Sequence, residues 1–448
     1  MLIKEFKEVR KSLKKILSSY KRENETISNE FLVRTCLLEN ISFQLPATAA
    51  DDPWIGLREW IRNSRKIFSS QTAIKELDAK GNVAVIGGYT AQSEAIVKYI
   101  EFESGEKLNL YFGKAEWPQM PKVNKLLYWI LWSHACMPFV LKCLFSKYRA
   151  NWALLIRELN DTAVFMYWLK FYQIKRLYDF LPYELESNWI SWLCFQRGIE
   201  VVKIPSSGPL ATHNSILISD KIVFSSPYHF EELKVFNHSI RYKKILKWGP
   251  ERAFQYINRY QREKPISHPK VLGFYSHASW VRLSQDHSDV GMNIPEAEEL
   301  LLKDLSRFVT ENPNYSIRVF LHPREKAKDV LNQAVTYYGQ MLGKGRFHFA
   351  NFEVPTTASF EEAEIALSAF STILFERLFC GYKTMIGNYG IPSFPINGSD
   401  LNHICFGSYE RMSELIVRFS LVNELEFFEQ TNLVDYLWNS YPSWCHKS

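Results

Sequence analysis

The sequence predicts an α/β protein made of two doubly wound domains that face each other across a cleft. In both halves of the chain, short β-branched and aromatic runs alternate with helical segments, a pattern typical of crossover connections and a mostly parallel sheet. The alternation is most regular over 270–390. Between the halves, 242–269 is rich in Lys, Arg and Pro and lacks an apolar period, so we place the domain boundary there.

The first domain is predicted to span 1–245. Residues 1 to about 80 have helical periodicity, and strands begin to alternate with helices after them. The predicted strands are short apolar runs: 82–86, 108–112, 162–166, 175–180 and 200–204.

The second domain is predicted to span 266–410, and the amphipathic stretch 411–448 is expected to pack back on the first domain. The predicted strands of the second domain are again short and apolar: 271–275, 316–321, 346–349, 363–367 and 383–387.

Helix signals separate these strands. Asn293 is a candidate N-cap with a glutamate three residues later, and its helix is expected to stop before Asn312. A second helix is predicted at about 325–342. A third, 372–379, is expected to end at Gly381, because glycine readily adopts the left-handed conformation that closes a helix.

The composition is that of a globular protein of ordinary charge. The chain has 448 residues, of which 46% are hydrophobic and 23% charged, enough to bury two cores. Its formal net charge of +6 gives a mild positive field, which suits an anionic substrate or a membrane surface. There is no dense basic block, so we expect no nucleic-acid partner.

The cysteines and the N-terminus indicate a cytoplasmic protein. The seven cysteines are scattered, without the CxxC spacing of a zinc site, and most lie in apolar runs, so we expect reduced, buried thiols. The first ten residues are too charged to form the apolar core of a secretory signal. The cysteines are Cys36, Cys136, Cys143, Cys194, Cys380, Cys405 and Cys445.

The segment 126–145 is largely apolar and aromatic, with lysines before, within and after it. Polar residues, Pro138 and Lys142 interrupt it, so it lacks the roughly 20 uninterrupted apolar residues of a membrane span. Three interpretations stay open: a buried helix pair broken at Pro138, an interfacial helix on anionic lipid, or a transmembrane helix. The second would bring 122–149 to the inner face of the cytoplasmic membrane.

Two loops at strand ends of the second domain point to a phosphate site. His322, Pro323 and Arg324 follow one strand, where proline restricts the turn and the other two residues border the crevice. A second loop ends in small hydroxyl residues that precede a helix, whose first N–H groups and positive dipole end favour an anion. We interpret the two loops as neighbours in one sheet; the hydroxyl residues are Ser368, Ser371 and Thr372.

Further polar residues belong to the same expected site. Glu376 lies more than one turn into the helix, where its carboxylate could reach a ribose diol. Ser276 and Ser279 follow another strand and could contact the donor, although a plain polar loop is an equally good interpretation. For Ser371 and Thr372, ordinary capping of the helix is the alternative interpretation. The sequence 286–289 contains Asp and His but has no partner cluster, so no metal is expected.

This order of motifs resembles the C-terminal nucleotide-binding domain of GT-B fold glycosyltransferases, which have two Rossmann-like domains. A His-Pro pair followed by a Ser/Thr motif is similar to bacterial sialyltransferases, polysialyltransferases and Kdo transferases of capsule synthesis, which use CMP-activated acid sugars. The resemblance covers 270–390. It implies that His322 helps to hold and neutralise the CMP phosphate and that Ser371 and Thr372 grip it.

The general base of those families is an acidic residue of the N-terminal domain, often in an acidic-acidic-glycine motif, and this sequence has no such motif on a suitable strand end. The best substitutes are Glu184 and Glu186, where a predicted strand gives way to a helix. Capping and solvation of the helix start is an equally good interpretation of these residues. His213 and His277 come next as candidates.

The resulting prediction is a glycosyltransferase that needs no metal and no cofactor and inverts the anomeric centre, with His322 and Glu184 or Glu186 as catalytic residues. The expected partners are a nucleotide sugar, first a CMP-activated acid sugar, and a glycan or glycolipid acceptor of a surface polysaccharide. The alternatives are a UDP- or GDP-sugar transferase, a polyol-phosphate transferase, a sugar-nucleotide epimerase and a non-catalytic nucleotide- or glycan-binding protein.

Overall fold

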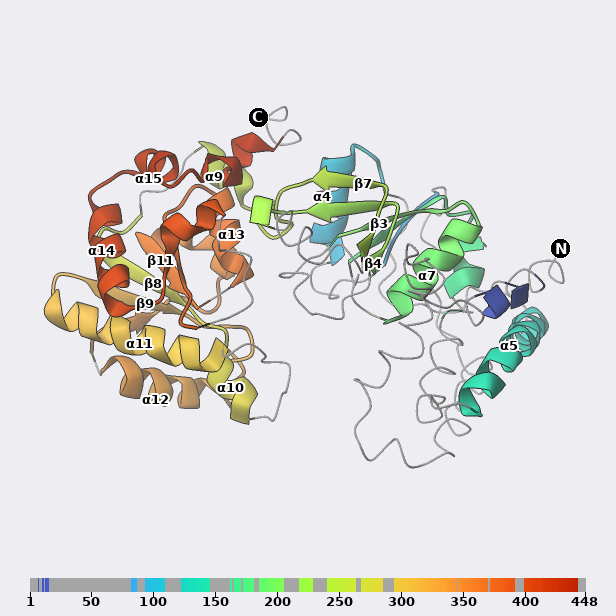
Figure 1. Ribbon diagram of the computed structural model, residues 1–448, viewed down its shortest axis with the longest axis horizontal. Helices are drawn as coiled ribbons and strands as arrows, with labels where there is room; N and C mark the ends of the chain where they lie inside the picture. The colour runs from blue at the N-terminus through green and yellow to red at the C-terminus, as the bar shows by residue number, and fades with distance from the viewer. Residues whose placement is uncertain are drawn as a thin grey trace, which may run out of the picture. The chain divides into compact units, whose positions relative to one another are not determined.

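The structure of the protein is a computed structural model that divides into two compact units (Figure 1). Unit 1 comprises Met1–Ser206, Thr212–Val223 and Phe236–Leu246, and unit 2 comprises Ser207–Ala211, Phe224–Val235 and Lys247–Ser448. The residues that the structure describes are 7, 10–11, 13–15, 82–86, 93–108, 122–145, 162, 165–170, 172–180, 185–204, 217–228, 240–262, 267–284, 294–343, 345–369, 371–390 and 399–441.

Unit 1 is built around a sheet in which β1, β2, β3 and β5 pair in parallel and β7 lies beside β5. A short parallel pair, β4 and β6, stands apart from it. The strands are β1 (Val83–Ile86), β2 (Arg176–Asp179), β3 (Glu200–Lys203), β4 (Leu217–Ile218), β5 (Lys221–Phe224), β6 (Ile240–Arg241) and β7 (Lys244–Lys247), and the helices are α4 (Ser93–Ser104), α5 (Lys122–Leu144) and α7 (Leu185–Gln196).

Three of the predicted strands in this half, 82–86, 175–180 and 200–204, are confirmed as β1, β2 and β3. Of the predicted strand 108–112, all but the first residue lies outside the described residues, as does nearly all of the predicted helical region before residue 80. The strands from β4 to β7 were not predicted; β4 and β6 have only two residues each and carry almost no periodic signal.

The predicted strand at 162–166 is wrong. Phe165 and Met166 begin a helical stretch at 165–170, and Thr162 is helical too. The buried side chains of Thr162, Phe165, Met166 and Leu169 are spaced as one face of a helix, at three, four and seven residues from the first. The β-branched and aromatic composition suggested a strand, but the spacing of the buried positions is helical.

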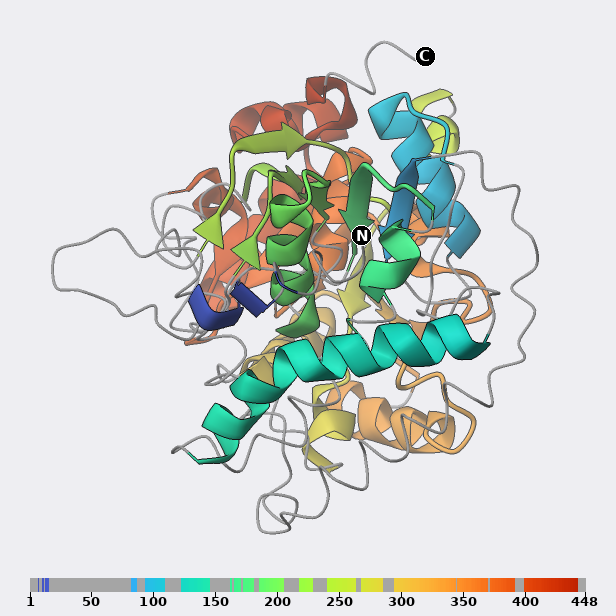
Figure 2. The same ribbon diagram turned by 90° about the vertical axis from the view of Figure 1, so that its right-hand side faces the viewer.

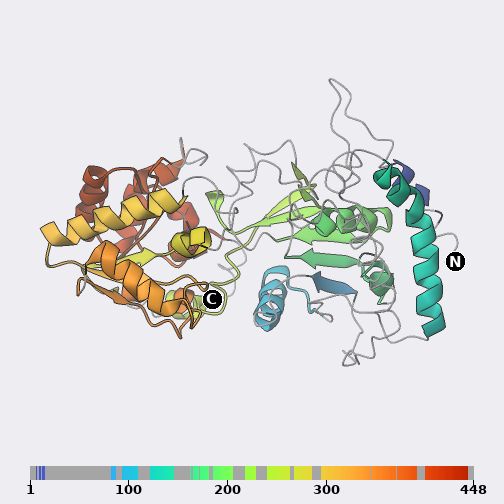
Figure 3. The same cartoon turned by 90° about the horizontal axis from the view of Figure 1, so that it is seen from below.

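Helix α5 runs through Pro138 without a break, so the predicted helix pair is wrong (Figure 2 and Figure 3). A proline inside a helix removes one hydrogen bond and usually bends or ends it. Here the apolar contacts on both sides of Pro138 continue, since Cys136 and Val140 are both buried, and the last turn closes with the bond from Phe145 N to Leu141 O at 3.0 Å.

Unit 2 contains a six-stranded sheet in which every pair of neighbours is parallel. The first strand, β8, lies inside the sheet: the chain builds outward through β9 to β10, then returns to the other side of β8 with β11. The order reverses between β8 and β11, where ligands of such sheets usually bind. The strands are β8 (Val271–Tyr275), β9 (Ser316–Phe320), β10 (Phe347–Phe349), β11 (Ile365–Ser368), β12 (Thr384–Gly387) and β13 (Cys405–Phe406).

Helices of unit 2 cover this sheet. Helices α11 and α12 lie side by side (Figure 1), α11 also contacts β9 and α14, and α13 packs on β11 and β12. The helices are α9 (Ile257–Arg262), α10 (Ser279–Ser284), α11 (Ile294–Glu311), α12 (Leu331–Leu342), α13 (Thr372–Phe379), α14 (Tyr409–Ser420) and α15 (Glu424–Gln430).

The five predicted strands of the second half are all confirmed, and β13 is an addition. The predicted helix 372–379 is α13, and Gly381 after it has the expected left-handed φ of 82°. The helix predicted from about residue 325 begins only at Leu331, because the carboxylate of Glu325 binds the preceding loop instead of opening a helix. The predicted packing of 411–448 on the first domain stays a prediction; within unit 2, α14 contacts β11 and β13.

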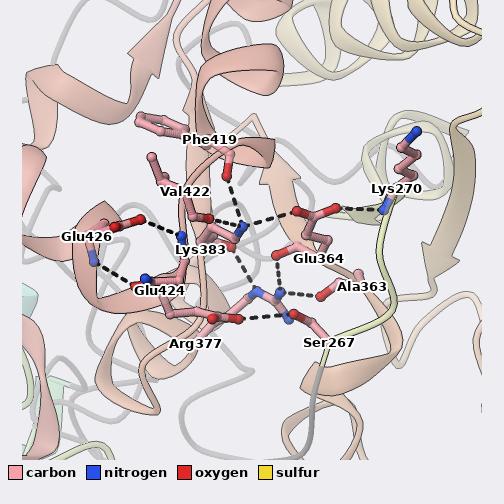
Figure 4. Close-up of polar contacts among 11 residues, drawn as sticks. Ser267, Lys270, Ala363, Glu364, Arg377, Lys383, Phe419, Val422, Glu424 and Glu426 are labelled. Atoms are coloured by element: carbon pink, nitrogen blue, oxygen red, sulfur yellow. Dashed lines mark hydrogen bonds and ion pairs between the residues drawn. The ribbon is translucent and has the colours of Figure 1, made fainter.

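A buried arginine binds the segment that precedes β11. Arg377, in α13, is fully buried and its guanidinium group is surrounded by backbone carbonyls (Figure 4). These carbonyls precede β11 and β12, so the side chain joins both segments to α13. The acceptors are the carbonyl oxygens of Phe360, Ala363 at 2.6 Å, Glu364 at 3.2 Å and Lys383 at 3.2 Å.

The side chain of Lys383, at the start of β12, is the second buried cation of this region. Its Nζ donates to Glu364 Oε1 at 3.1 Å and to the carbonyl oxygens of Phe419 and Val422, both at 2.9 Å (Figure 4). Because those carbonyls close the C-terminal end of α14, the ammonium group satisfies acceptors that the helix itself leaves unpaired.

Three of the four described cysteine thiols are buried, as predicted: Cys136, Cys194 and Cys380. Cys405 is only partly buried. Burial raises the pKa of the Cys194 thiol to about 12 and that of Cys405 to about 12, so both remain protonated at neutral pH.

Candidate functional site

Three strand ends of the second sheet are joined by one peptide group, the one between Tyr275 and Ser276. On one side, the Ser276 N–H donates to Phe320 O at the end of β9, at 3.1 Å. On the other side, the Tyr275 carbonyl accepts the hydroxyl of Ser368 at the end of β11, at 2.7 Å. The loops that follow β8, β9 and β11 therefore start from a single hydrogen-bonded row.

The two loops predicted to be neighbours are separated by a strand. His322 follows β9 and Ser371 follows β11, and β8 lies between these two strands. The prediction that the two loops follow adjacent strands is therefore wrong. The ends of β9 and β11 are about 10 Å apart, because one strand lies between them. The sequence order of strands does not specify their spatial order, and here the chain crosses back over β8 before forming β11.

A buried carboxylate shapes the loop after β9. Glu325 Oε2 accepts the backbone N–H of His322 at 2.8 Å, while Oε1 accepts Trp280 Nε1 at 2.7 Å and the Tyr338 hydroxyl at 2.8 Å. Burial raises the pKa of Glu325. The backbone N–H of Arg324 donates to His322 Nδ1 at 3.2 Å, so a neutral imidazole carries its proton on Nε2. His322 is half-buried, and Pro323 and Arg324 are exposed.

A second buried carboxylate, Glu298 of α11, faces the loop after β8. Its Oε2 accepts the backbone N–H of His277 at 2.8 Å, and the hydroxyl and N–H of Ser279 lie beside it. Burial raises the pKa of Glu298 to about 8, against the effect of these hydrogen bonds. Ala278, which lies between His277 and Ser279, is buried and has a φ of 56°. This left-handed conformation costs a residue with a side chain about 1–3 kcal/mol.

The loop after β11 leads into α13. Ser368 is fully buried, with its hydroxyl on the β8 carbonyl described above. Ser371 occupies the N-cap position, but its side chain makes no capping hydrogen bond to the first turn, unlike Ser408 at the start of α14, which accepts from Arg411 N at 3.3 Å. Ser371 and Thr372 are half-buried. The hydroxyl of Ser371 therefore does not cap the N-terminus of α13.

Glu376 lies one turn further along α13 in a cluster of polar groups. Its Oε2 accepts the hydroxyl of Thr357 at 2.9 Å, and its Oε1 is 3.7 Å from Arg252 Nη1. Burial raises the pKa of Glu376, and it raises the pKa of the neighbouring Glu251 to about 7. The predicted contact of Glu376 with a ribose diol stays a prediction.

The predicted site residues differ in their accessibility. His322, Arg324, Ser371 and Thr372 are at least partly accessible, whereas the hydroxyls of Ser276, Ser279 and Ser368 are buried against groups of the protein itself. Glu184, His213 and the sequence 286–289 lie outside the described residues, and only the backbone of Glu186, in α7, is described. In the described part of the chain, no group of three or more His, Cys, Asp or Glu side chains could hold a metal ion.

Glu298 and Glu325 were not recognised from the sequence. Glu298 falls on the same helical face as Leu301, Leu302 and Leu305, which are all buried, so a carboxylate on an apolar face was the available signal. For Glu325 there was no such signal, because it lies in turns between β9 and α12.

At the carboxyl edge of the first sheet, a buried lysine was also missed. Lys203, the last residue of β3, donates to Asn188 Oδ1 at 2.7 Å, and its Nζ lies 4.0 Å from Asp179 Oδ2 at the end of β2. All three side chains are buried. Asn188 thus binds a lysine from within α7.

We predict that Glu298→Gln removes a pH dependence of stability. The pKa of Glu298 is about 8 in the folded protein against a usual 4.5, so between these values the folded state binds one more proton than the unfolded state, and stability falls as pH rises. Gln resembles the neutral carboxyl. Urea unfolding between about pH 5 and 8 should show a slope that is shallower by up to about 1.4 kcal/mol per pH unit.

The matched control is Glu414→Gln, which changes a glutamate whose side chain is 59% exposed. This variant should keep the slope of the natural protein. An unchanged slope in Glu298→Gln would show that the carboxyl of Glu298 is ionised in the folded state.

Both units are thus α/β structures on parallel strands, which confirms the predicted fold class; their arrangement around a cleft stays a prediction. No model of a protein family matches the chain, and no curated protein matches it. The chain is similar to several solved structures. One is UDP-GlcNAc 2-epimerase from Neisseria meningitidis bound to UDP-GlcNAc, with a TM-score of 0.47 and 10% identity over 80% of this chain and 96% of that chain. The second is MnaA from S. aureus with UDP, with a TM-score of 0.44 and 9% identity over 79% of this chain and 91% of that chain. The third is a glycosyltransferase from Rickettsia africae, with a TM-score of 0.42 and 10% identity over 82% of this chain and 99% of that chain.

Proposed function

We propose that unit 2 binds the phosphate of a nucleotide-activated sugar and that the protein transfers this sugar to a glycan or glycolipid acceptor without a metal. The observation that carries the proposal is the pair of accessible groups around the end of β8. On one side stands His322 with a ring N–H, and on the other the N-terminus of α13, which its own cap residue does not close.

The chemistry supports this use of the two loops. A nucleotide leaving group develops negative charge on its phosphate, and preorganised donors stabilise that charge most when they need no rearrangement. The N–H groups and dipole of α13 supply one such donor set. His322 Nε2–H supplies another, because its loop is held by Glu325 and its Nδ1 by Arg324.

The first-choice donor is a CMP-activated acid sugar, as the His-Pro and Ser/Thr motifs favour. A UDP- or GDP-sugar transferase, a polyol-phosphate transferase and a sugar-nucleotide epimerase are the alternatives. An epimerase is distinguished by turnover without any acceptor. Glu184 and Glu186 remain the proposed general bases, and at least one of Glu184→Gln and Glu186→Gln should lower the transfer rate while sparing donor affinity.

The test is a thermal unfolding series with CMP, CDP, UDP and GDP, each compared with its nucleoside. A ligand that binds only the folded state at a hundred times its dissociation constant stabilises it by about 2.7 kcal/mol. We expect at least one nucleotide to raise the melting temperature and its nucleoside to raise it less. The absence of any shift across the series at millimolar ligand would refute the phosphate site.

A double variant, Ser371→Ala with Thr372→Val, tests the N-terminus of α13 directly. We expect affinity for the nucleotide to fall about tenfold, since two hydroxyls beside the phosphate are lost, while affinity for the nucleoside changes little. Isothermal titration calorimetry measures both affinities.

Ser408→Ala is the control for capping alone. Ser408 does cap its helix, so this variant should lose about 1 kcal/mol of stability and keep nucleotide affinity. If the double variant instead lost stability as Ser408→Ala does and bound nucleotide and nucleoside equally well, Ser371 and Thr372 would have only a structural role.

A further inference from the structure

Helix α5 presents an exposed stripe that is mainly apolar and is interrupted by the exposed His134. Leu127, Ile130, Met137 and Leu141 are each 41–47% exposed, and Phe145, directly after the helix, is 83% exposed. At about 100° per residue, these positions fall within about 80° of arc on one side of the helix. Large apolar side chains gathered in this way on one surface usually mark a site of contact.

The opposite side of α5 is packed against the protein, so the stripe is not a consequence of a loosely held helix. The six buried side chains of the helix fall within about 140° of arc on the side opposite the stripe. Tyr128 and Trp132 also stack, with ring centroids 6.4 Å apart. The buried residues are Tyr128, Trp129, Trp132, Ala135, Cys136 and Val140.

The charge of this region indicates which kind of surface the stripe binds. Between Glu116 and Glu158 the chain contains no Asp or Glu, whereas Lys residues lie in α5 and basic residues follow it. A segment with only basic charge and a row of apolar side chains complements a surface that combines negative charge with hydrocarbon, which is the composition of an anionic bilayer surface. A protein partner would need to supply both features in the same geometry.

Helix α5 itself does not meet the requirements of a membrane span, since none of the described helices is long and apolar enough to cross a bilayer. It is 23 residues long and contains His134 and Pro138. A helix with one apolar side and one side packed on protein would lie in the plane of the interface.

We propose that the exposed stripe of α5 docks the protein on the surface of an anionic lipid bilayer, with the helix parallel to the membrane. The side chains of Leu127, Ile130, Met137, Leu141 and Phe145 enter the boundary between headgroups and acyl chains. The basic residues of the segment attract the acidic headgroups.

Vesicle co-sedimentation of the full chain tests the proposal. We expect the protein to bind vesicles of phosphatidylcholine with phosphatidylglycerol, to bind pure phosphatidylcholine more weakly, and to be released in part by salt. Ile130→Gln with Leu141→Gln should lower the partition coefficient about tenfold or more, because two apolar side chains no longer enter the bilayer.

The control replaces exposed leucines elsewhere, Leu421→Gln with Leu425→Gln, which are 82% and 63% exposed and should leave vesicle binding unchanged. Leu127→Gln with Met137→Gln, on the same stripe, repeats the test if the first double variant unfolds.

Three results would overturn the proposal. The first is failure of the natural protein to bind anionic vesicles, and the second is unchanged binding by both stripe variants. The third is a dimer in light scattering that the stripe variants abolish while vesicle binding is absent, which would make the stripe an interface between two copies of the chain.

Discussion

His322→Ala is expected to lower nucleotide-sugar turnover on the order of a hundredfold and to leave the fold intact. We expect a large loss because, in the proposed site, the imidazole Nε2–H donates to the leaving phosphate, and removal of one such fixed donor commonly costs that much in rate. The fold should survive because Glu325 binds the backbone N–H of His322, which alanine keeps. Release of free nucleotide measures turnover, and thermal unfolding measures stability.

His348→Ala is the matched control, because His348 lies in β10 of the same sheet and is exposed. It should leave turnover and nucleotide affinity unchanged. Full retention of both by His322→Ala would remove His322 from the site, and a fall in stability that accounts for the lost activity would give the residue a structural role instead.

Arg377→Met is expected to give the largest loss of stability, at least about 3 kcal/mol. Methionine fills much of the same space but leaves the carbonyl oxygens of Phe360, Ala363 and Glu364 without their buried donor, and each unpaired buried acceptor costs about 1–3 kcal/mol. Urea unfolding measures the change. Because these carbonyls precede β11, we also expect weaker nucleotide binding near the melting transition.

Arg411→Met is the control for the loss of a guanidinium group as such. The side chain of Arg411 is 39% exposed and pairs with Glu414 three residues later in α14, so its replacement should change stability by about 0.5 kcal/mol or less. Equal, small effects of the two substitutions would mean that water replaces Arg377 at the three carbonyls.

Five strands of the second half could be predicted from the sequence because each is a short apolar run between clear helix and turn signals. Gly381, for example, marked the end of α13 correctly, with a positive φ. Composition alone misled at 162–166, where the spacing of Phe165, Met166 and Leu169 is helical. A prediction that weighed spacing above residue type would have been correct there.

The candidate site was predictable only in part. The positions of His322 after a strand and of Ser371 before a helix were predicted correctly, since loop and helix-start signals lie within a few residues. Their separation by β8 was not, because spatial strand order depends on contacts between residues far apart in the chain. Glu325 escaped for a related reason: its partners Trp280 and Tyr338 are distant in sequence, and only the fold brings them to its carboxylate.

The place of β8 within its sheet has a consequence for synthesis on the ribosome. Strands β8, β9 and β10 come from 271–349, so this half of the sheet is able to pair soon after it emerges. The bond from Ser368 to the Tyr275 carbonyl spans 93 residues, so β8 keeps one open edge until β11 is translated. The proposed phosphate site is therefore completed late, and a nascent chain that stalls before residue 365 exposes an unpaired strand edge at which chaperones or other chains could bind.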